Sequence, residues 1–164
     1  QGLMTACMPA RVHHFYLDNF YNANRLAKGA MVLAGETLDL GKIAVPAYHV
    51  ATKEDHIAPP QSVYRGATML GSKDSTFILA GSGHIAGVVN PPAAGKYQYW
   101  TNMSDCSSLE QFVAGATQTP GSWWPDWIDW IGGQEGDRIE AKGARIPKGN
   151  QDLGDAPGTY VRTR

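Results

Sequence analysis

Two short motifs carry the residues of this sequence that could do acid–base chemistry. One is the segment 53–59, Lys-Glu-Asp-His-Ile-Ala-Pro, and the other is the segment 81–87, Gly-Ser-Gly-His-Ile-Ala-Gly. Apolar runs at 43–50 and 76–80 precede them. Both motifs are therefore predicted to lie where a strand ends, at the edge of an open parallel sheet where sites are built.

Asp55 and His84 are the candidate catalytic pair in these motifs. A carboxylate that holds an imidazole fixes its tautomer and stabilises the cation that forms on proton transfer. Such a pair is two-thirds of a triad that activates a nucleophile. An Asp after one strand and a His after the next is also the chain order of the α/β-hydrolase triad, in which the nucleophile comes earlier.

Each member of the pair has an alternative interpretation. Asp55 could instead cap the helix expected after Pro59, and an exposed loop histidine such as His84 is often inert. His56 could be the titrating residue, although adjacent side chains rarely point the same way.

The pattern Gly-x-Gly-x-x-Ala at 81–86 also fits a relaxed dinucleotide fingerprint. That site needs a helix whose N-terminus meets the pyrophosphate, whereas Asn-Pro-Pro at 90–92 prevents a long helix. No zinc-type cysteine spacing is present. We therefore expect neither a cofactor nor a metal.

Apolar periodicity predicts the elements that must position these motifs. Tyr97, Tyr99 and Trp100 are interpreted as an aromatic cluster in a loop. Four helices are predicted: residues 8–26, ended by Gly29; a helix from Pro59-Pro60 to Gly71; residues 108–116; and residues from about 122 to 131. The predicted strands are 45–50 and 76–80.

Two parallel strands joined by a helix bury little surface and leave two open edges. We therefore expect part of a larger α/β domain, whose sheet edges are incompletely covered or are covered by self-association. The predicted organisation is a catalytic part at 1–133 and a polar, partly docked tail at 134–164.

The composition restricts the function. The 164 residues suit one domain, and 43% hydrophobic residues allow a buried core. A net charge of −1 gives no reason to expect nucleic acid or an anionic membrane surface. No run is long enough for a transmembrane helix, the start at Gln1 is interpreted as a trimmed end, and Cys7 and Cys106 are expected to be free thiols.

The tryptophans near the predicted last helix have two interpretations. Trp127 and Trp130 are one turn apart and are expected to pack into the core. Otherwise they form an exposed apolar patch for a hydrophobic partner.

Several stretches of the sequence resemble the class I polyhydroxyalkanoate synthases, the family that makes poly(3-hydroxybutyrate). They are 53–59, 81–92, Tyr-Trp-Thr-Asn at 99–102 and Gly-Ser-Trp-Trp-Pro-Asp-Trp at 121–127. The stretch 156–161 resembles the family's terminus. The similarity runs from about Met8 onward, and the first seven residues depart from the family pattern.

The resemblance implies an incomplete α/β-hydrolase-type domain with a Cys-His-Asp triad. Such an acyltransferase polymerises 3-hydroxyacyl-coenzyme A thioesters into polyester and releases coenzyme A. The family's Asp falls on Asp55 and its His on His84, with His56 a candidate substrate-binding residue. The resemblance also implies the growing polyester as a partner, a homodimer in the parent enzyme, and a cytoplasmic location at the surface of polymer granules.

The family's nucleophilic cysteine lies upstream in a G-x-C-x-G elbow, and neither Cys7 nor Cys106 has flanking glycines. We therefore expect the C-terminal part of a catalytic domain, which supplies Asp and His to a thiol elsewhere in the parent polypeptide and is inactive alone. The alternative is a non-catalytic binding fragment that presents residues 123–130 to a granule, a lipid or a protein.

Overall fold

The computed structural model describes residues 8–136, 156–159 and 161. The chain divides into two units, residues 1–127 and residues 128–164. The predicted boundary between 133 and 134 stays a prediction, and the predictions for Cys7 and for most of the tail lie outside the described residues. In the described ranges, no helix combines the length and the apolar character needed to cross a membrane.

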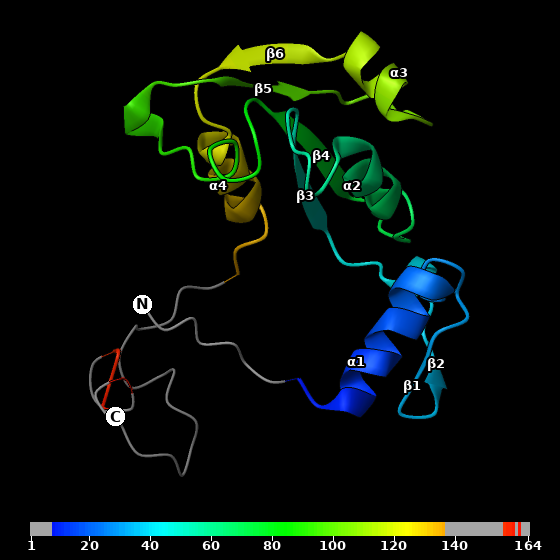
Figure 1. Cartoon of the computed structure of the whole chain (residues 1–164). Coiled ribbons are helices and arrows are strands. Elements are labelled where there is room, and N and C mark those ends of the chain that lie inside the picture. Colours follow the sequence, from blue (N-terminus) through cyan, green and yellow to red (C-terminus); the bar gives the residue numbers. More distant parts are fainter. Residues whose placement is uncertain (1–7, 137–155, 160, 162–164) are drawn as a thin grey trace. The chain divides into compact units, whose positions relative to one another are not determined.

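A four-stranded mixed sheet forms the centre of the first unit (Figure 1). Its first two strands are parallel and joined by a helix, as predicted, and the other two are antiparallel additions. The strand order is β3 (Ala47–Thr52), β4 (Ser75–Ala80), β5 (Gln98–Thr101) and β6 (Thr117–Pro120), and the connecting helix is α2 (Pro60–Ala67).

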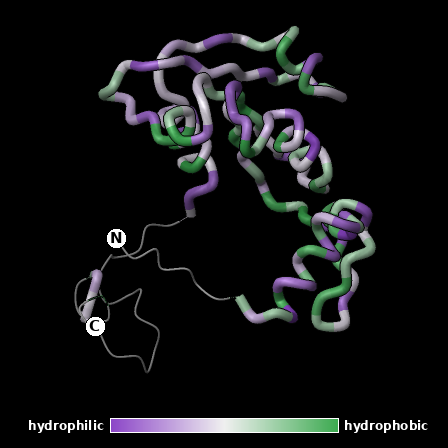
Figure 2. Tube along the Cα trace, in the orientation of Figure 1, coloured by the Kyte–Doolittle hydropathy of each residue, from purple (hydrophilic) through white to green (hydrophobic). Residues whose placement is uncertain are grey.

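The two predicted parallel strands are present, but the antiparallel strands β5 and β6 were not predicted, because their sequences gave little strand signal. The predicted aromatic loop contains β5, in which Tyr99 and Trp100 point to opposite faces of the sheet. The sequence of β6 is Thr-Gln-Thr-Pro, which Figure 2 colours as largely hydrophilic. In the described part of the chain, no strand pairs with the outer edge of β3 or β6, in agreement with the expected uncovered edges.

One face of the sheet packs against α2 and against α3 (Leu109–Ala114). Tyr64, Phe77 and Phe112 meet there edge to face or tilted, with ring centroids 4.8 to 6.0 Å apart. α3 begins where predicted, since the Ser108 hydroxyl caps it by accepting from the Gln111 N–H. These contacts fix the helix that follows the Asp55 motif.

The other face buries Ile78, Ala80, Tyr99 and Trp123 near the start of α4 (Trp124–Gly132). Trp127 is 38% exposed, so the expectation that it packs into the core was wrong. It lies at the rim of this cluster, with its ring 5.9 Å from that of Trp123.

The predicted N-terminal helix is shorter than its apolar pattern. It ends at Asn22, and Asn24 then adopts a φ of 46°, which leaves the helical region before Gly29 is reached. The remaining elements are α1 (Ala10–Tyr16), the π-helix η1 (Leu17–Asn22), the hairpin β1 (Val32–Leu33) and β2 (Glu36–Thr37), and the 3₁₀ turns η2 (Leu40–Lys42) and η3 (Pro92–Ala94).

Candidate active site

The parallel strands β3 and β4 bring the two chemical motifs together. Thr52 and Ala80 are register partners at the ends of these strands. The hydrogen bonding continues past the strands, since Lys53 N–H donates to the Ala80 carbonyl at 2.8 Å and Glu54 N–H donates to that of Ser82 at 3.0 Å. The turns that carry Asp55 and His84 are therefore adjacent.

Asp55 uses its two carboxylate oxygens for different purposes. Oδ1 accepts from the backbone N–H groups of Ile57 and Ala58, at 2.8 and 2.9 Å, and so closes its own turn. Oδ2 accepts from the Thr52 hydroxyl at 3.1 Å and faces His84. The side chain is only 6% exposed, so its position is fixed by these contacts.

The Nδ1 atom of His84 lies 2.8 Å from Oδ2 of Asp55. Because a carboxylate only accepts hydrogen bonds, Nδ1 carries the proton in this contact. The lone pair of the neutral ring is then on Nε2, which has no hydrogen-bond partner among the described residues. The imidazole is 45% exposed, so Nε2 is available to accept a proton.

The surroundings hold the pKa of Asp55 well below its ordinary value. The hydrogen bond from the Ala58 N–H is the largest cause, and those from His84, Ile57 and Thr52 act in the same direction. Desolvation opposes them without reversing the result. Asp55 is therefore a carboxylate at neutral pH.

The alternative interpretations fare differently. Asp55 does not cap α2, because Pro59 occupies the N-cap position. The dinucleotide interpretation fails because residues 84–88 form turns where that site needs a helix. His56 is exposed and makes no hydrogen bond to Asp55 or His84 among the described contacts, so its role in substrate binding stays a prediction.

The sequence analysis missed the neighbours that hold the pair. Thr52 is the last residue of β3 and is 1% exposed, and its place directly before the charged motif was the available signal. Trp123 and Trp124 donate indole hydrogen bonds to the turn that carries His84. Their distance along the chain from that turn hid this contact.

Cys106 is a free thiol, as predicted, and is the only cysteine in the described ranges. Its sulfur lies 3.4 to 3.5 Å from the Ser104 carbonyl and the Asn102 amide in a loop before α3. In that same part of the chain, no group of three or more His, Cys, Asp or Glu side chains could hold a metal ion.

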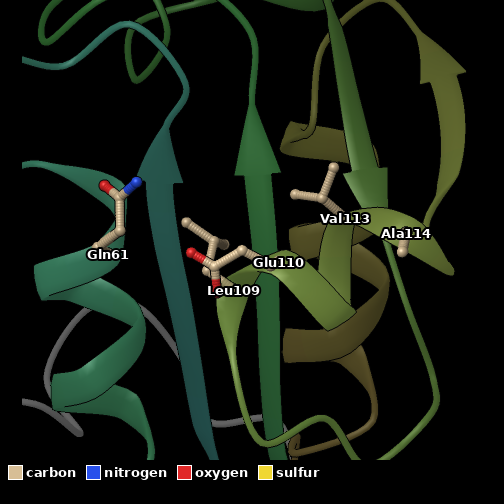
Figure 3. A pocket seen from close by; sticks show the side chains of 5 residues that line it. All are labelled: Gln61, Leu109, Glu110, Val113 and Ala114. Atoms are coloured by element: carbon tan, nitrogen blue, oxygen red, sulfur yellow. The ribbon is translucent and has the colours of Figure 1, made fainter.

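A shallow pocket of about 360 Å³ lies on α2 and α3 (Figure 3). It contains neither member of the carboxylate–imidazole pair. Its lining is mainly apolar and consists of Gln61, Leu109, Glu110, Val113 and Ala114.

Comparison with known proteins finds several curated relatives, although no family model matches the chain. The chain is 51% identical to the poly(3-hydroxyalkanoate) polymerase subunit PhaC of Rhizobium meliloti and 49% identical to the poly(3-hydroxyalkanoate) polymerase of Methylorubrum extorquens. It is 39% identical to the PhaC subunit of Cupriavidus necator. Each match covers 96% of this chain but only 25 to 27% of the relative, so the chain spans about a quarter of their length.

Proposed function

The chain belongs to the poly(3-hydroxyalkanoate) polymerases, and on this premise we propose that it supplies the acid–base half of their active site. In this proposal Asp55 and His84 activate a cysteine thiol that another part of the parent polypeptide carries. The observation that carries the proposal is the 2.8 Å contact between His84 Nδ1 and Asp55 Oδ2, which leaves Nε2 unpartnered among the described residues. The parent enzyme is an acyltransferase that joins 3-hydroxyacyl units.

The first chemical step loads the enzyme. A cysteine thiol with an ordinary pKa of about 8.5 is mostly protonated at neutral pH. Nε2 of His84 takes the thiol proton, and the thiolate attacks the carbonyl carbon of the acyl-coenzyme A thioester. The bond to the coenzyme A sulfur breaks, and coenzyme A leaves as a thiol with the proton that His84 returns.

The second step extends the polymer. The hydroxyl oxygen of another 3-hydroxyacyl group attacks the acyl-enzyme, and its proton passes to Nε2 of His84. The new ester bond forms as the cysteine sulfur leaves, and His84 returns the proton to it. Asp55 stabilises the imidazolium during both steps, because its lowered pKa keeps it ionised.

The same premise supports three wider parts of the proposal. The parallel β3–α2–β4 unit with Asp and His at its strand ends is what an α/β-hydrolase-type domain would place there. The open edge of β3 is where such a sheet would continue into the rest of the parent polypeptide. The homodimer and the cytoplasmic location at the granule surface rest on the family resemblance.

Substitutions at the pair test the proposal in the full-length parent polymerase. Coenzyme A release from 3-hydroxybutyryl-coenzyme A is measured with a thiol reagent for His84→Ala and Asp55→Asn. Each should lower turnover by about 10²- to 10⁴-fold. The control is His13→Ala, which removes an exposed imidazole on α1. Turnover of His84→Ala at the level of this control would refute the proposal.

A further inference from the structure

The turn that carries His84 lacks regular structure of its own. Within it, Gly87 N–H donates to the Gly83 carbonyl at 2.9 Å, and the N–H groups of Val88 and Val89 both donate to the Ile85 carbonyl, at 3.2 and 2.8 Å. These three bonds are all internal to the turn, so they do not fix how its far end, residues 87–89, sits on the sheet. Gly87 is buried, so its carbonyl needs a donor from elsewhere in the fold, because buried backbone groups are rarely left unpaired.

Two consecutive tryptophans donate to this end of the turn, the first of them to the buried Gly87 carbonyl. The indole N–H of Trp123 donates to the Gly87 carbonyl at 3.0 Å, and that of Trp124 donates to the Val88 carbonyl at 3.0 Å. Each pair is separated by 36 positions along the chain. Neighbouring carbonyls of the turn are therefore held by neighbouring side chains at the start of α4.

The tryptophans are themselves fixed to the sheet. Trp123 is 8% exposed and stacks on Tyr48 of β3 with ring centroids 6.2 Å apart. The Tyr48 hydroxyl donates to the Asp126 carboxylate at 2.5 Å, and the Ser122 hydroxyl accepts from the Trp124 N–H at 3.1 Å. Since β3 also ends at the Asp55 motif, one strand locates both halves of the pair.

Gly87 of the turn rests closely on Thr52. A Cβ atom on Gly87 would lie 2.5 Å from the Thr52 methyl carbon, so the turn and the end of β3 are in direct contact. We infer that Trp123 and Trp124 are positioning residues for His84, which hold its turn against Thr52 so that the imidazole meets Asp55. This inference rests on the proposed function for its effect on turnover.

The test uses Trp124→Phe in the full-length parent polymerase. Phenylalanine keeps an aromatic ring and removes the N–H donor. The matched control is Trp127→Phe in the same helix, because the indole N–H of Trp127 has no hydrogen-bond partner among the described residues. Should Trp124→Phe not fold, 3-benzothienylalanine at position 124 keeps the ring's shape and removes only the donor.

The expected result separates positioning from general stability. For Trp124→Phe, kcat should fall about five- to tenfold with an unchanged KM for acyl-coenzyme A, and hydrogen–deuterium exchange of residues 83–89 should accelerate. Trp127→Phe should show neither change. A kcat equal to that of the control, or unchanged protection of the turn, would overturn the inference. If His84→Ala were fully active, the proposed function would fail, while the exchange comparison would still test the positioning.

Discussion

Replacing Gly87 with alanine tests how closely activity depends on the fit between the His84 turn and β3. The added methyl would lie 2.5 Å from the Thr52 methyl carbon and 2.6 Å from the Gly81 carbonyl oxygen. Both belong to parts of the sheet end that cannot rotate away freely, since Thr52 is almost fully buried and the other atom is backbone. The turn itself must therefore move.

The required displacement follows from these distances. Carbon atoms prefer separations of about 3.5 to 4.0 Å, so a 2.5 Å approach forces a withdrawal of about 1 Å. The contact between His84 Nδ1 and Asp55 is 2.8 Å, and a shift of that size brings it beyond ordinary hydrogen-bond length. A misplacement of about 1 Å can lower a rate about 10²-fold, whereas overpacking costs about 1–3 kcal/mol of stability.

The assay is coenzyme A release by the full-length parent polymerase, with thermal unfolding measured in parallel. Gly83→Ala is the matched control in the same turn, because its Cβ would meet only the Glu54 carbonyl oxygen at 3.8 Å, an ordinary contact. Gly87→Ala should lose about 10²-fold in turnover while Gly83→Ala stays near the wild type. Equal turnover of the two folded variants would refute this reasoning.

Three further predictions concern stability, each measured by denaturant or thermal unfolding. Because folding lowers the pKa of Asp55, the ionised carboxylate stabilises the fold at pH values above 3.8, the pKa of this group in the unfolded chain. The stability advantage of the wild type over Asp55→Asn should be complete near neutral pH and disappear as the pH falls below 3.8. A stability difference that does not vary with pH would contradict this. Ser108→Ala removes the α3 cap and should cost about 1 kcal/mol, whereas Ser104→Ala, which removes an exposed hydroxyl with no hydrogen bond among the described contacts, should cost less. Phe112→Ala removes the ring at the centre of the aromatic cluster and should lower the free energy of unfolding by about 3–5 kcal/mol. A loss below about 1 kcal/mol would mean that this cluster contributes little to the stability of the core.

The candidate pair could be predicted from the sequence because its determinants are local. Each motif follows an apolar strand, and parallel strands joined by a helix place their ends at one edge. Asp55 and His84 therefore meet as the sequence analysis expected. The function of the second carboxylate oxygen, which closes the turn through Ile57 and Ala58, was not predictable from spacing.

The features that the sequence analysis missed depend on distant partners. β6 lacks the apolar alternation of a strand, and its extended conformation depends on its antiparallel pairing with β5. The end of the N-terminal helix at Asn22 is the exception, because the left-handed Asn24 sets it locally although the apolar pattern continues past this point. The indole hydrogen bonds from Trp123 and Trp124 join segments that are 36 positions apart along the chain. The role of these two side chains as hydrogen-bond donors could therefore not be predicted from the sequence.

The most direct test of the central idea is the alkylation rate of the nucleophilic cysteine in the full-length parent polymerase. The rate with iodoacetamide at neutral pH is compared between the wild type, His84→Ala and the His13→Ala control. If His84 removes the thiol proton with help from Asp55, the alkylation rate of His84→Ala should fall to that of an ordinary thiol, which forms thiolate only at a pH of about 8.5. A wild-type alkylation rate in His84→Ala would contradict the account, because the imidazole would then play no part in forming the thiolate.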